Sequence, residues 1–212
     1  MNLPLKASIN AEAFLAPIEN PRGLIMRFVY ATTRRRFGKV LTPLSVFAAR
    51  LPPAFGTFYG KVSSLDRKLV LSPEIAILIR QRVAQINVCS FCSDIGRWYA
   101  IKNASMTVAK LDALDEYHTN PLFTGKERAA LDYATELTQH KTVSRETFER
   151  LANECSEREI CEIAWLVASE HLYNISNIGM NIHSDRLCSA MYKIDKTDAA
   201  DETIELQAEP RV

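Results

Sequence analysis

Residues 72–104 read SPEIAILIRQRVAQINVCSFCSDIGRWYAIKNA, and this stretch decides the fold. Its first three residues offer a hydroxyl cap, a proline that suits the first turn of a helix, and an acid near the positive end of the helix dipole. They predict a helix over 73–86. Asn87 is a good cap or turn residue, so a second helix is expected over about 89–104.

The two cysteines of this stretch, Cys89 and Cys92, are expected on one face of the first turn of the second helix. Thiols in that position lie close to unpaired backbone N–H groups and to the positive end of the helix dipole, and both favour the thiolate form. The spacing of the two cysteines also allows a disulfide between them. Three readings stay open: a redox dithiol, part of a metal site, or two thiols packed as small hydrophobic side chains. Zinc is disfavoured because Cys155 and Cys161 have the wrong spacing for a second ligand pair, so no metal is expected.

Composition narrows the class of protein. The 212 residues include 47% hydrophobic and 24% charged residues, with 26 Lys and Arg against 25 Asp and Glu. This balance creates no global field for nucleic acid or an anionic membrane surface, so a small molecule or a protein is the expected partner. No signal peptide and no apolar run of about 18–20 residues is seen, which predicts a cytoplasmic protein. Five scattered cysteines also argue against a secreted disulfide framework.

The rest of the chain is expected to be all-α, because the sequence has only seven glycines and no strong period-2 alternation. Two capping-box patterns predict helices over about 125–139 and 157–178, and Ser144 marks a shorter helix between them. Apolar stripes on the two longer helices are core or subunit interface. Upstream, two or three more helices are expected, broken at prolines; these are Pro43, Pro52 and Pro53.

No Ser-rich or Gly-rich linker divides the chain, so one all-helical domain is expected over 1–194, with its core at 45–180. Residues 195–212 are charged and poor in large apolar side chains. They are expected to form a flexible tail, or an arm that reaches a neighbour.

The cysteine region resembles a known family. Asn87, Cys89, Phe91 and Cys92 fit the Asn-x-Cys-x-aromatic-Cys signature of the carboxymuconolactone decarboxylase and AhpD-like alkylhydroperoxidase superfamily, and the helices that follow resemble those of its longer members. The resemblance covers about 45–180. It implies an AhpD-like helical bundle that assembles as a homo-oligomer (dimer, trimer or hexamer), with the CxxC pair close to subunit contacts.

The resemblance also implies an activity. In AhpD-like members the second cysteine is peroxidatic and the first is resolving, so Cys92 would attack a hydroperoxide oxygen and Cys89 would close the disulfide. The expected substrate is a small molecule such as an organic hydroperoxide, with a thiol or lipoyl-type reductant and no cofactor. The decarboxylase branch generally lacks this dithiol, which favours redox chemistry.

The sequence departs from the peroxidase signature at two positions. Ile77 stands where the family has the glutamate of its proton relay, and Gly96 stands where it has the histidine. Two residues are singled out as substitutes, Asp94 for its proximity to the motif and His171 because histidine titrates near neutral pH. Other candidate polar residues are Glu74, Gln81, Gln85, Arg97 and Glu170.

The leading interpretation is an AhpD-like thiol oxidoreductase, either a weak peroxidase or a disulfide-cycling protein, that uses Cys89 and Cys92. The alternative keeps the fold and replaces the catalysis with a homo-oligomeric small-molecule-binding role. A third interpretation, a lactone or decarboxylation enzyme of the same superfamily, needs a base that the sequence does not identify.

Overall fold

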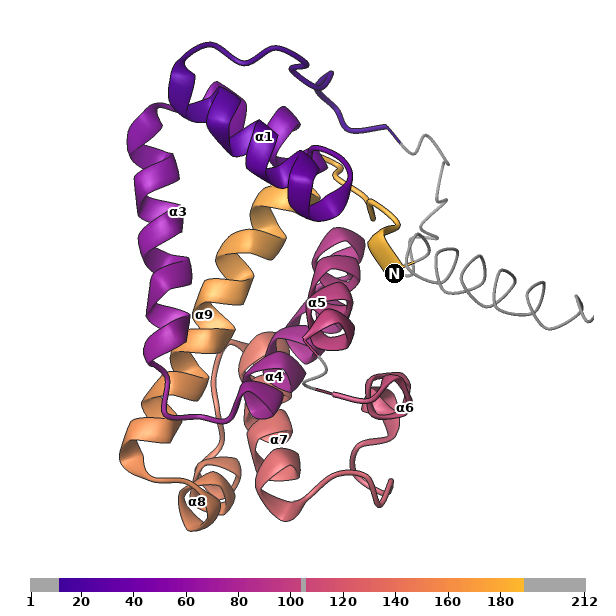
Figure 1. Ribbon diagram of the computed structural model, residues 1–212. Coiled ribbons are helices and arrows are strands. Elements are labelled where there is room, and N and C mark those ends of the chain that lie inside the picture. The colour runs from indigo at the N-terminus through magenta and orange to yellow at the C-terminus, as the bar shows by residue number, and fades with distance from the viewer. Residues whose placement is uncertain (1–11, 104–105, 189–212) are drawn as a thin grey trace, which may run out of the picture.

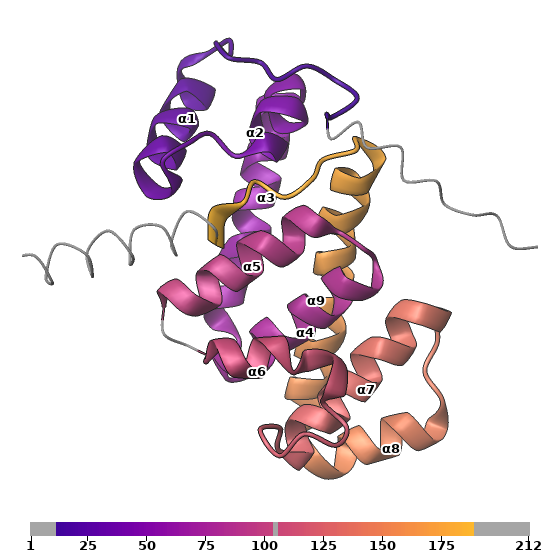
Figure 2. The same cartoon turned by 90° about the vertical axis from the view of Figure 1, so that its right-hand side faces the viewer.

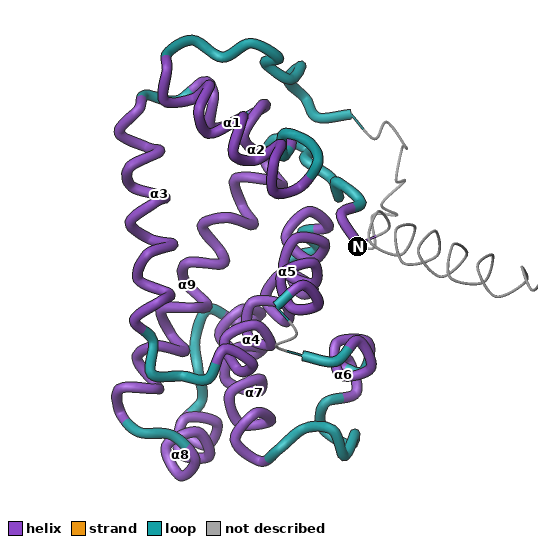
Figure 3. The backbone as a smooth tube through the Cα atoms, viewed as in Figure 1, coloured by secondary structure: helices purple, strands orange, loops and turns teal. Residues whose placement is uncertain are grey.

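The computed structural model describes residues 12–103 and 106–188 (Figure 1). Over these residues the chain forms helices joined by loops and short 3-10 turns, without a strand (Figure 3). The predicted all-α class is therefore confirmed. The helices are α1 (Leu24–Phe37), α2 (Thr42–Val46), α3 (Pro53–Leu65), α4 (Pro73–Ile86), α5 (Ser90–Lys102), α6 (Val108–Asp112), α7 (Gly125–His140), α8 (Arg145–Glu154) and α9 (Glu157–Gly179). The predicted tail, 195–212, lies outside the described residues.

The predicted helix starts are confirmed for the helices whose N-cap residue is recognisable in the sequence. Ser72 caps α4 by accepting a hydrogen bond from the N–H of Ile75, and α7 and α9 both begin with complete capping boxes. The cysteine helix differs in detail, because α5 begins at Ser90 and Cys89 is its N-cap. Only the second cysteine therefore lies inside the first turn.

The N-terminal prolines begin helices. Pro43 lies in the first turn of α2, and Pro53 is the first residue of α3 with Pro52 as its N-cap. A proline suits the first turn because the N–H that it lacks has no partner there. The expectation of two or three helices in this part of the chain is met by α1, α2 and α3.

The main core lies between α4, α7 and α9, with α8 packed against α7 at one end (Figures 1 and 2). Its side chains come from apolar positions that recur at helical spacing, as the sequence predicts. The fully buried members are Ile79, Val83, Ala134, Leu151, Ile163 and Leu166. Helix α3 runs alongside α9, where the rings of Tyr59 and Tyr173 have centroids 5.7 Å apart.

A second apolar cluster surrounds the two cysteines. It joins α2, the end of α4 and α5 to residues 181–188, which follow α9 and which we call the 181–188 segment. The buried members are Leu41, Val46, Ala84, Cys89, Phe91, Cys92, Trp98, Ile182 and Leu187. Among the described residues, no helix has the length and apolar character that crossing a bilayer requires.

The start of α9 is held by Glu159, which yields a prediction about acid stability. Its carboxylate accepts hydrogen bonds from the N–H and hydroxyl of Ser156, both at 2.9 Å, and from Lys126 Nζ at 2.6 Å. The hydrogen bond from Lys126, followed by the Ser156 N–H, lowers the pKa of Glu159 from its ordinary 4.5 to about 2. A carboxylate with a lowered pKa stabilises the fold above its unfolded-state pKa, and this stabilisation is lost as the pH falls through the folded-state pKa.

We therefore expect Glu159→Gln to lower the free energy of unfolding by about 1 kcal/mol at neutral pH, because the variant lacks the ion pair. The difference from the wild type should shrink as the pH falls from 4.5 toward 2. Urea unfolding across this range measures it, with Glu157→Gln in the same exposed turn as the control. A difference that stays constant with pH would contradict this role of Glu159.

Candidate functional site

The turn between α4 and α5 places the cysteines. Asn87 is the C-cap of α4, and Val88 follows in the left-handed region with φ 56°. A β-branched residue rarely adopts this conformation, so the surrounding structure must hold it. The side-chain amide of Asn87 helps to hold this turn by tying it to α9. Its Nδ2 donates to Asn174 Oδ1 at 2.9 Å and lies 3.1 Å from His171 Nδ1.

Cys89 and Cys92 are joined as a disulfide, with their Cα atoms 5.3 Å apart. The N–H of Cys92 donates to Cys89 Sγ at 3.3 Å, and Asn177 Nδ2 donates to Cys92 Sγ at 3.4 Å. The site is thus built from the end of α4, the first turn of α5 and the last turns of α9. Cys89 is 1% exposed and Cys92 is 5% exposed, so a reagent reaches either sulfur only after a local movement.

The 181–188 segment covers this part of α5. Asp94 Oδ2 accepts hydrogen bonds from Ser184 Oγ and from the N–H of Leu187, both at 2.9 Å, and Asp94 Oδ1 accepts one from the N–H of Cys188 at 3.3 Å. Because Ile182 and Leu187 belong to the cluster that encloses the disulfide, Asp94 holds part of the cover in place. The structure therefore places this candidate residue at an anchor of the segment.

A second carboxylate anchors the same segment to α2. Asp185 accepts hydrogen bonds from the N–H of Thr42 at 2.9 Å and from its hydroxyl at 2.6 Å. It also lies 3.1 Å from Lys39 Nζ. The segment is thus attached to α5 through Asp94 and to α2 through Asp185.

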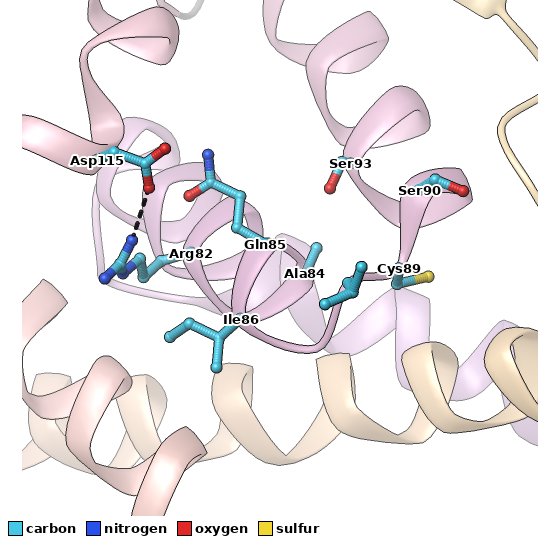
Figure 4. A pocket seen from close by; sticks show the side chains of 9 residues that line it. Arg82, Ala84, Gln85, Ile86, Cys89, Ser90, Ser93 and Asp115 are labelled. Carbon is cyan, nitrogen blue, oxygen red and sulfur yellow. Dashed lines mark hydrogen bonds and ion pairs between the residues drawn. The ribbon is translucent and has the colours of Figure 1, made fainter. Parts of the chain in front are cut away.

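A cavity of about 420 Å³ lies next to Cys89. Figure 4 shows the ion pair of Arg82 and Asp115, 3.0 Å apart, among its lining side chains, while the sulfur of Cys89 points away from Gln85 and Ala84. Gln85 Oε1 is buried with no hydrogen-bond partner among the described residues. The lining residues are Arg82, Ala84, Gln85, Ile86, Val88, Cys89, Ser90, Ser93 and Asp115.

At the two positions where the peroxidase signature has its proton relay, this chain has residues that only pack against their neighbours. Ile77 is half-buried against the apolar cluster between α4, α5 and α7. At Gly96, a Cβ atom would collide with Nε2 of Gln81, whose side chain is itself buried. Gln81 therefore fills the space into which a histidine at position 96 would extend.

Two other candidates are engaged in structural contacts, and a third lines the cavity. Arg97 Nη1 lies 2.7 Å from Asp112 Oδ1, and Glu74 Oε1 accepts a hydrogen bond of 2.7 Å from Lys110 Nζ. Gln85 faces the cavity. Over the described residues, the hydrogen bonds to the sulfurs of Cys89 and Cys92 come from the N–H of Cys92 and from Asn177, and from none of these three candidates.

Helix α9 carries a buried polar face toward the site. Glu170 accepts hydrogen bonds from Arg80 at 3.0 Å and from Asn174 at 2.6 Å. Burial raises the pKa of Glu170, although the Arg80 charge opposes this. Burial, followed by the Lys141 charge, lowers the pKa of His171, which favours the neutral ring.

Sequence reasoning singled out Glu170 and His171 but missed Asn174 and Asn177. The signal was the helical spacing itself, since Glu170, Asn174 and Asn177 recur at i, i+4 and i+7 and so share one face. All three are buried. Because this is the face that meets the cysteine turn, its polar residues are functional candidates.

Metal binding has no geometric support in the described part of the chain. No group of three or more His, Cys, Asp or Glu side chains over residues 12–103 and 106–188 is arranged to hold an ion.

Comparison with known proteins identifies relatives of the whole helical unit. The uncharacterized protein YnjA of Escherichia coli is 32% identical over 169 residues, which cover 78% of this chain and 91% of YnjA. No protein-family model matches the chain.

Solved structures share the fold. A cysteine-to-alanine variant of the debrominase Bmp8, in complex with 2,3,4-tribromopyrrole, matches with a TM-score of 0.71 at 17% identity, covering 86% of this chain and 97% of Bmp8. A peroxidase-related protein from Silicibacter has a TM-score of 0.65 at 20% identity, over 78% and 87% of the two chains. An AhpD antioxidant-defence candidate of unknown function from Agrobacterium tumefaciens has a TM-score of 0.60 at 20% identity, over 66% and 96%. The chain therefore belongs to the same protein family as Escherichia coli YnjA, and it has the helical fold of the AhpD-like and carboxymuconolactone decarboxylase superfamily.

Proposed function

We propose that the protein is a thiol oxidoreductase that cycles between the Cys89–Cys92 disulfide and the reduced dithiol. The observation that carries the proposal is the disulfide itself, placed at the N-terminus of α5. Both sulfurs accept N–H donors, and these donors, together with the positive end of the α5 dipole, favour a thiolate at Cys92, whereas its burial opposes one. In a reducing cytoplasm such a pair is redox-active rather than a permanent crosslink.

With a hydroperoxide as oxidant, the chemistry takes three steps. The Cys92 thiolate attacks one peroxide oxygen and the O–O bond breaks, so that an alcohol leaves after protonation and Cys92 becomes a sulfenic acid. Cys89 then attacks the Cys92 sulfur, closing the disulfide and releasing water. Two electrons from a dithiol reductant reopen the disulfide by thiol–disulfide exchange. The roles of Cys92 as peroxidatic and Cys89 as resolving follow the AhpD-like motif.

The test is turnover of an organic hydroperoxide with dithiothreitol as reductant. We expect Cys92→Ser to lose all turnover above the uncatalysed rate, because no other thiol occupies the first turn of α5. Cys161→Ser is the matched control, since Cys161 is an exposed free cysteine on α9 and should leave the rate unchanged. Equal rates for the wild type and Cys92→Ser would refute peroxidase chemistry at this pair.

The fold also supports a second candidate, a small-molecule-binding protein without thiol chemistry. The cavity of about 420 Å³ beside Cys89 favours it, as does the replacement of the family's proton relay by Ile77 and Gly96. The structural neighbour Bmp8 holds 2,3,4-tribromopyrrole, which makes this compound a direct probe. Calorimetric binding that is equal in the wild type and in Cys92→Ser, without turnover in either, would favour this candidate over the first.

We further propose that the chain forms a homo-oligomer, because large apolar side chains are exposed in groups. On α1, Leu24, Ile25 and Phe28 lie within two turns of each other, and on the outer face of α9, Ile175 and Ile178 are exposed. Large contiguous exposed apolar patches are uncommon on monomers and often mark interaction sites. Light scattering of the purified protein measures this, and a monomeric mass would exclude it.

A further inference from the structure

Asn177 occupies a position that the family's relay does not account for. Its side-chain amide reaches Cys92 from α9, and the donor Nδ2 lies 3.4 Å from Cys92 Sγ. Both residues are buried, with Asn177 6% exposed. The contact is therefore protected from competition with water, which strengthens an electrostatic interaction.

The hydrogen bond from Asn177 to Cys92 becomes stronger when the disulfide opens. In the oxidised protein the amide donates to a neutral sulfur, which is a weak acceptor. Reduction leaves Cys92 as a thiolate, and a hydrogen bond to an ionised acceptor is roughly twice as strong as one to a neutral acceptor. The amide thus stabilises the reduced, ionised form more than the oxidised form.

Backbone groups supply part of the same stabilisation. Cys92 is the third residue of α5, where the helix dipole favours negative charge. The usual histidine is absent, because position 96 is glycine and Gln81 fills its space. Asn177 comes from a helix 85 residues farther along the chain, so the side-chain donor has moved to a different element.

We propose that Asn177 is a catalytic residue that stabilises the Cys92 thiolate through its amide N–H, in place of the missing histidine. This inference rests on the proposed thiol chemistry of the Cys89–Cys92 pair. In the exchange step, an external thiolate attacks Cys89 Sγ, the Cys89–Cys92 bond breaks, and its electron pair goes to Cys92, which leaves as the thiolate that Asn177 binds. A second thiol of the reductant then displaces Cys89, whose sulfur takes up a proton from water.

The neighbouring polar residues fix this part of α9. Asn174, three residues earlier, is fully buried and is held by Glu170 and Asn87 at 2.6 and 2.9 Å. Because Asn87 belongs to the turn that leads into Cys89, the same helix face is tied both to the turn and to Cys92. A donor on such a fixed frame needs little reorganisation when charge develops.

The experiment follows the ionisation of Cys92 in the reduced, full-length protein, using NMR of isotope-labelled cysteine Cβ against pH. We expect Asn177→Ala to raise the midpoint of the Cys92 titration by about one pH unit, and to shift the equilibrium with glutathione by about tenfold toward the disulfide. Asn177→Asp keeps the shape but removes the donor, so it should raise the midpoint at least as far. Asn177→Ser keeps a shorter donor and should lie between the wild type and Asn177→Ala.

Ser176→Ala is the control, because Ser176 is half-buried on α9 and its hydroxyl bonds within its own helix, to the carbonyl of Leu172. It should leave the Cys92 titration unchanged. If the alanine and aspartate variants both titrate like the wild type while the wild-type disulfide still opens and closes, Asn177 has no such role and the proposed function stands. If the wild-type disulfide does not cycle with thiols at all, the proposed function fails, and the inference fails with it. Should Asn177→Ala not fold, the comparison of Asn177→Asp and Asn177→Ser with the wild type decides the question.

Discussion

Replacing Gly96 with histidine, the residue that the peroxidase motif has at this position, is expected to lower the free energy of unfolding by about 1–3 kcal/mol and to give no gain in peroxide turnover. The physical reason is steric. The first side-chain atom at position 96 already meets Nε2 of the buried Gln81, so an imidazole must displace a packed side chain. Replacing a helical glycine returns up to about 1 kcal/mol of helix propensity, which offsets only part of this cost.

A double-mutant cycle isolates the collision. Adding Gln81→Ala to Gly96→His should restore stability beyond the sum of the single effects by about 1 kcal/mol or more, because the two side chains compete for one space. Gly60→His on α3 is the matched control, since nothing lies within 4 Å of a Cβ atom at that position. Urea unfolding gives the free energies. If Gly96→His is as stable as Gly60→His, or if the two sites are additive, Gln81 does not fill the histidine's space.

The local signals in the sequence sufficed for the starts of the helices that carry a clear cap. Ser72 before Pro73 begins α4 where the cap pattern predicts, and Ser156 with Glu159 begins α9. These starts depend on hydrogen bonds between residues three apart, so a single sequence contains all the necessary information. The cysteine motif was also visible, because its spacing is local and its disulfide joins residues three positions apart.

The partners of the cysteines could not be found in the same way. Asn177 reaches Cys92 across 85 residues, and an asparagine carries no titratable group to attract attention. Its place depends on how α9 packs against α4 and α5, which is a tertiary result. Gln81 was considered only as a polar group near Cys89, whereas its packing against Gly96 depends on the contact between α4 and α5. Polar residues at helical spacing on an otherwise buried face of α9 were the sequence signal that could have pointed to Asn174 and Asn177.

Asp94 shows how proximity in sequence can suggest a different role from the one that the contacts support. It lies two residues after Cys92, which made it a candidate for proton transfer. Its oxygens instead accept hydrogen bonds from Ser184, Leu187 and Cys188. These contacts link the start of α5 to a segment that follows α9, and they suggest that the carboxylate controls access to the buried disulfide.

We therefore expect Asp94→Ala to speed reduction of the native Cys89–Cys92 disulfide by dithiothreitol about a hundredfold. The variant loses three hydrogen bonds to a charged acceptor, and each 1.4 kcal/mol lost from the closed state makes the open state ten times more populated. Because both sulfurs are nearly inaccessible when the segment is closed, the reduction rate follows the open population. Mass-resolved alkylation of the newly freed thiols measures this rate under native conditions.

Two further variants separate access from electrostatics, because removing a carboxylate near the N-terminus of α5 also changes the local field. Asp185→Ala loosens the same segment at α2, where its carboxylate bonds to Thr42, and it should speed reduction as well. Asp112→Ala removes a half-exposed carboxylate that pairs with Arg97 on α5 without touching the segment, so its rate should stay near that of the wild type. If Asp94→Ala alone is fast and Asp185→Ala is not, the field explains the effect; if neither is fast, the 181–188 segment does not limit access to the disulfide.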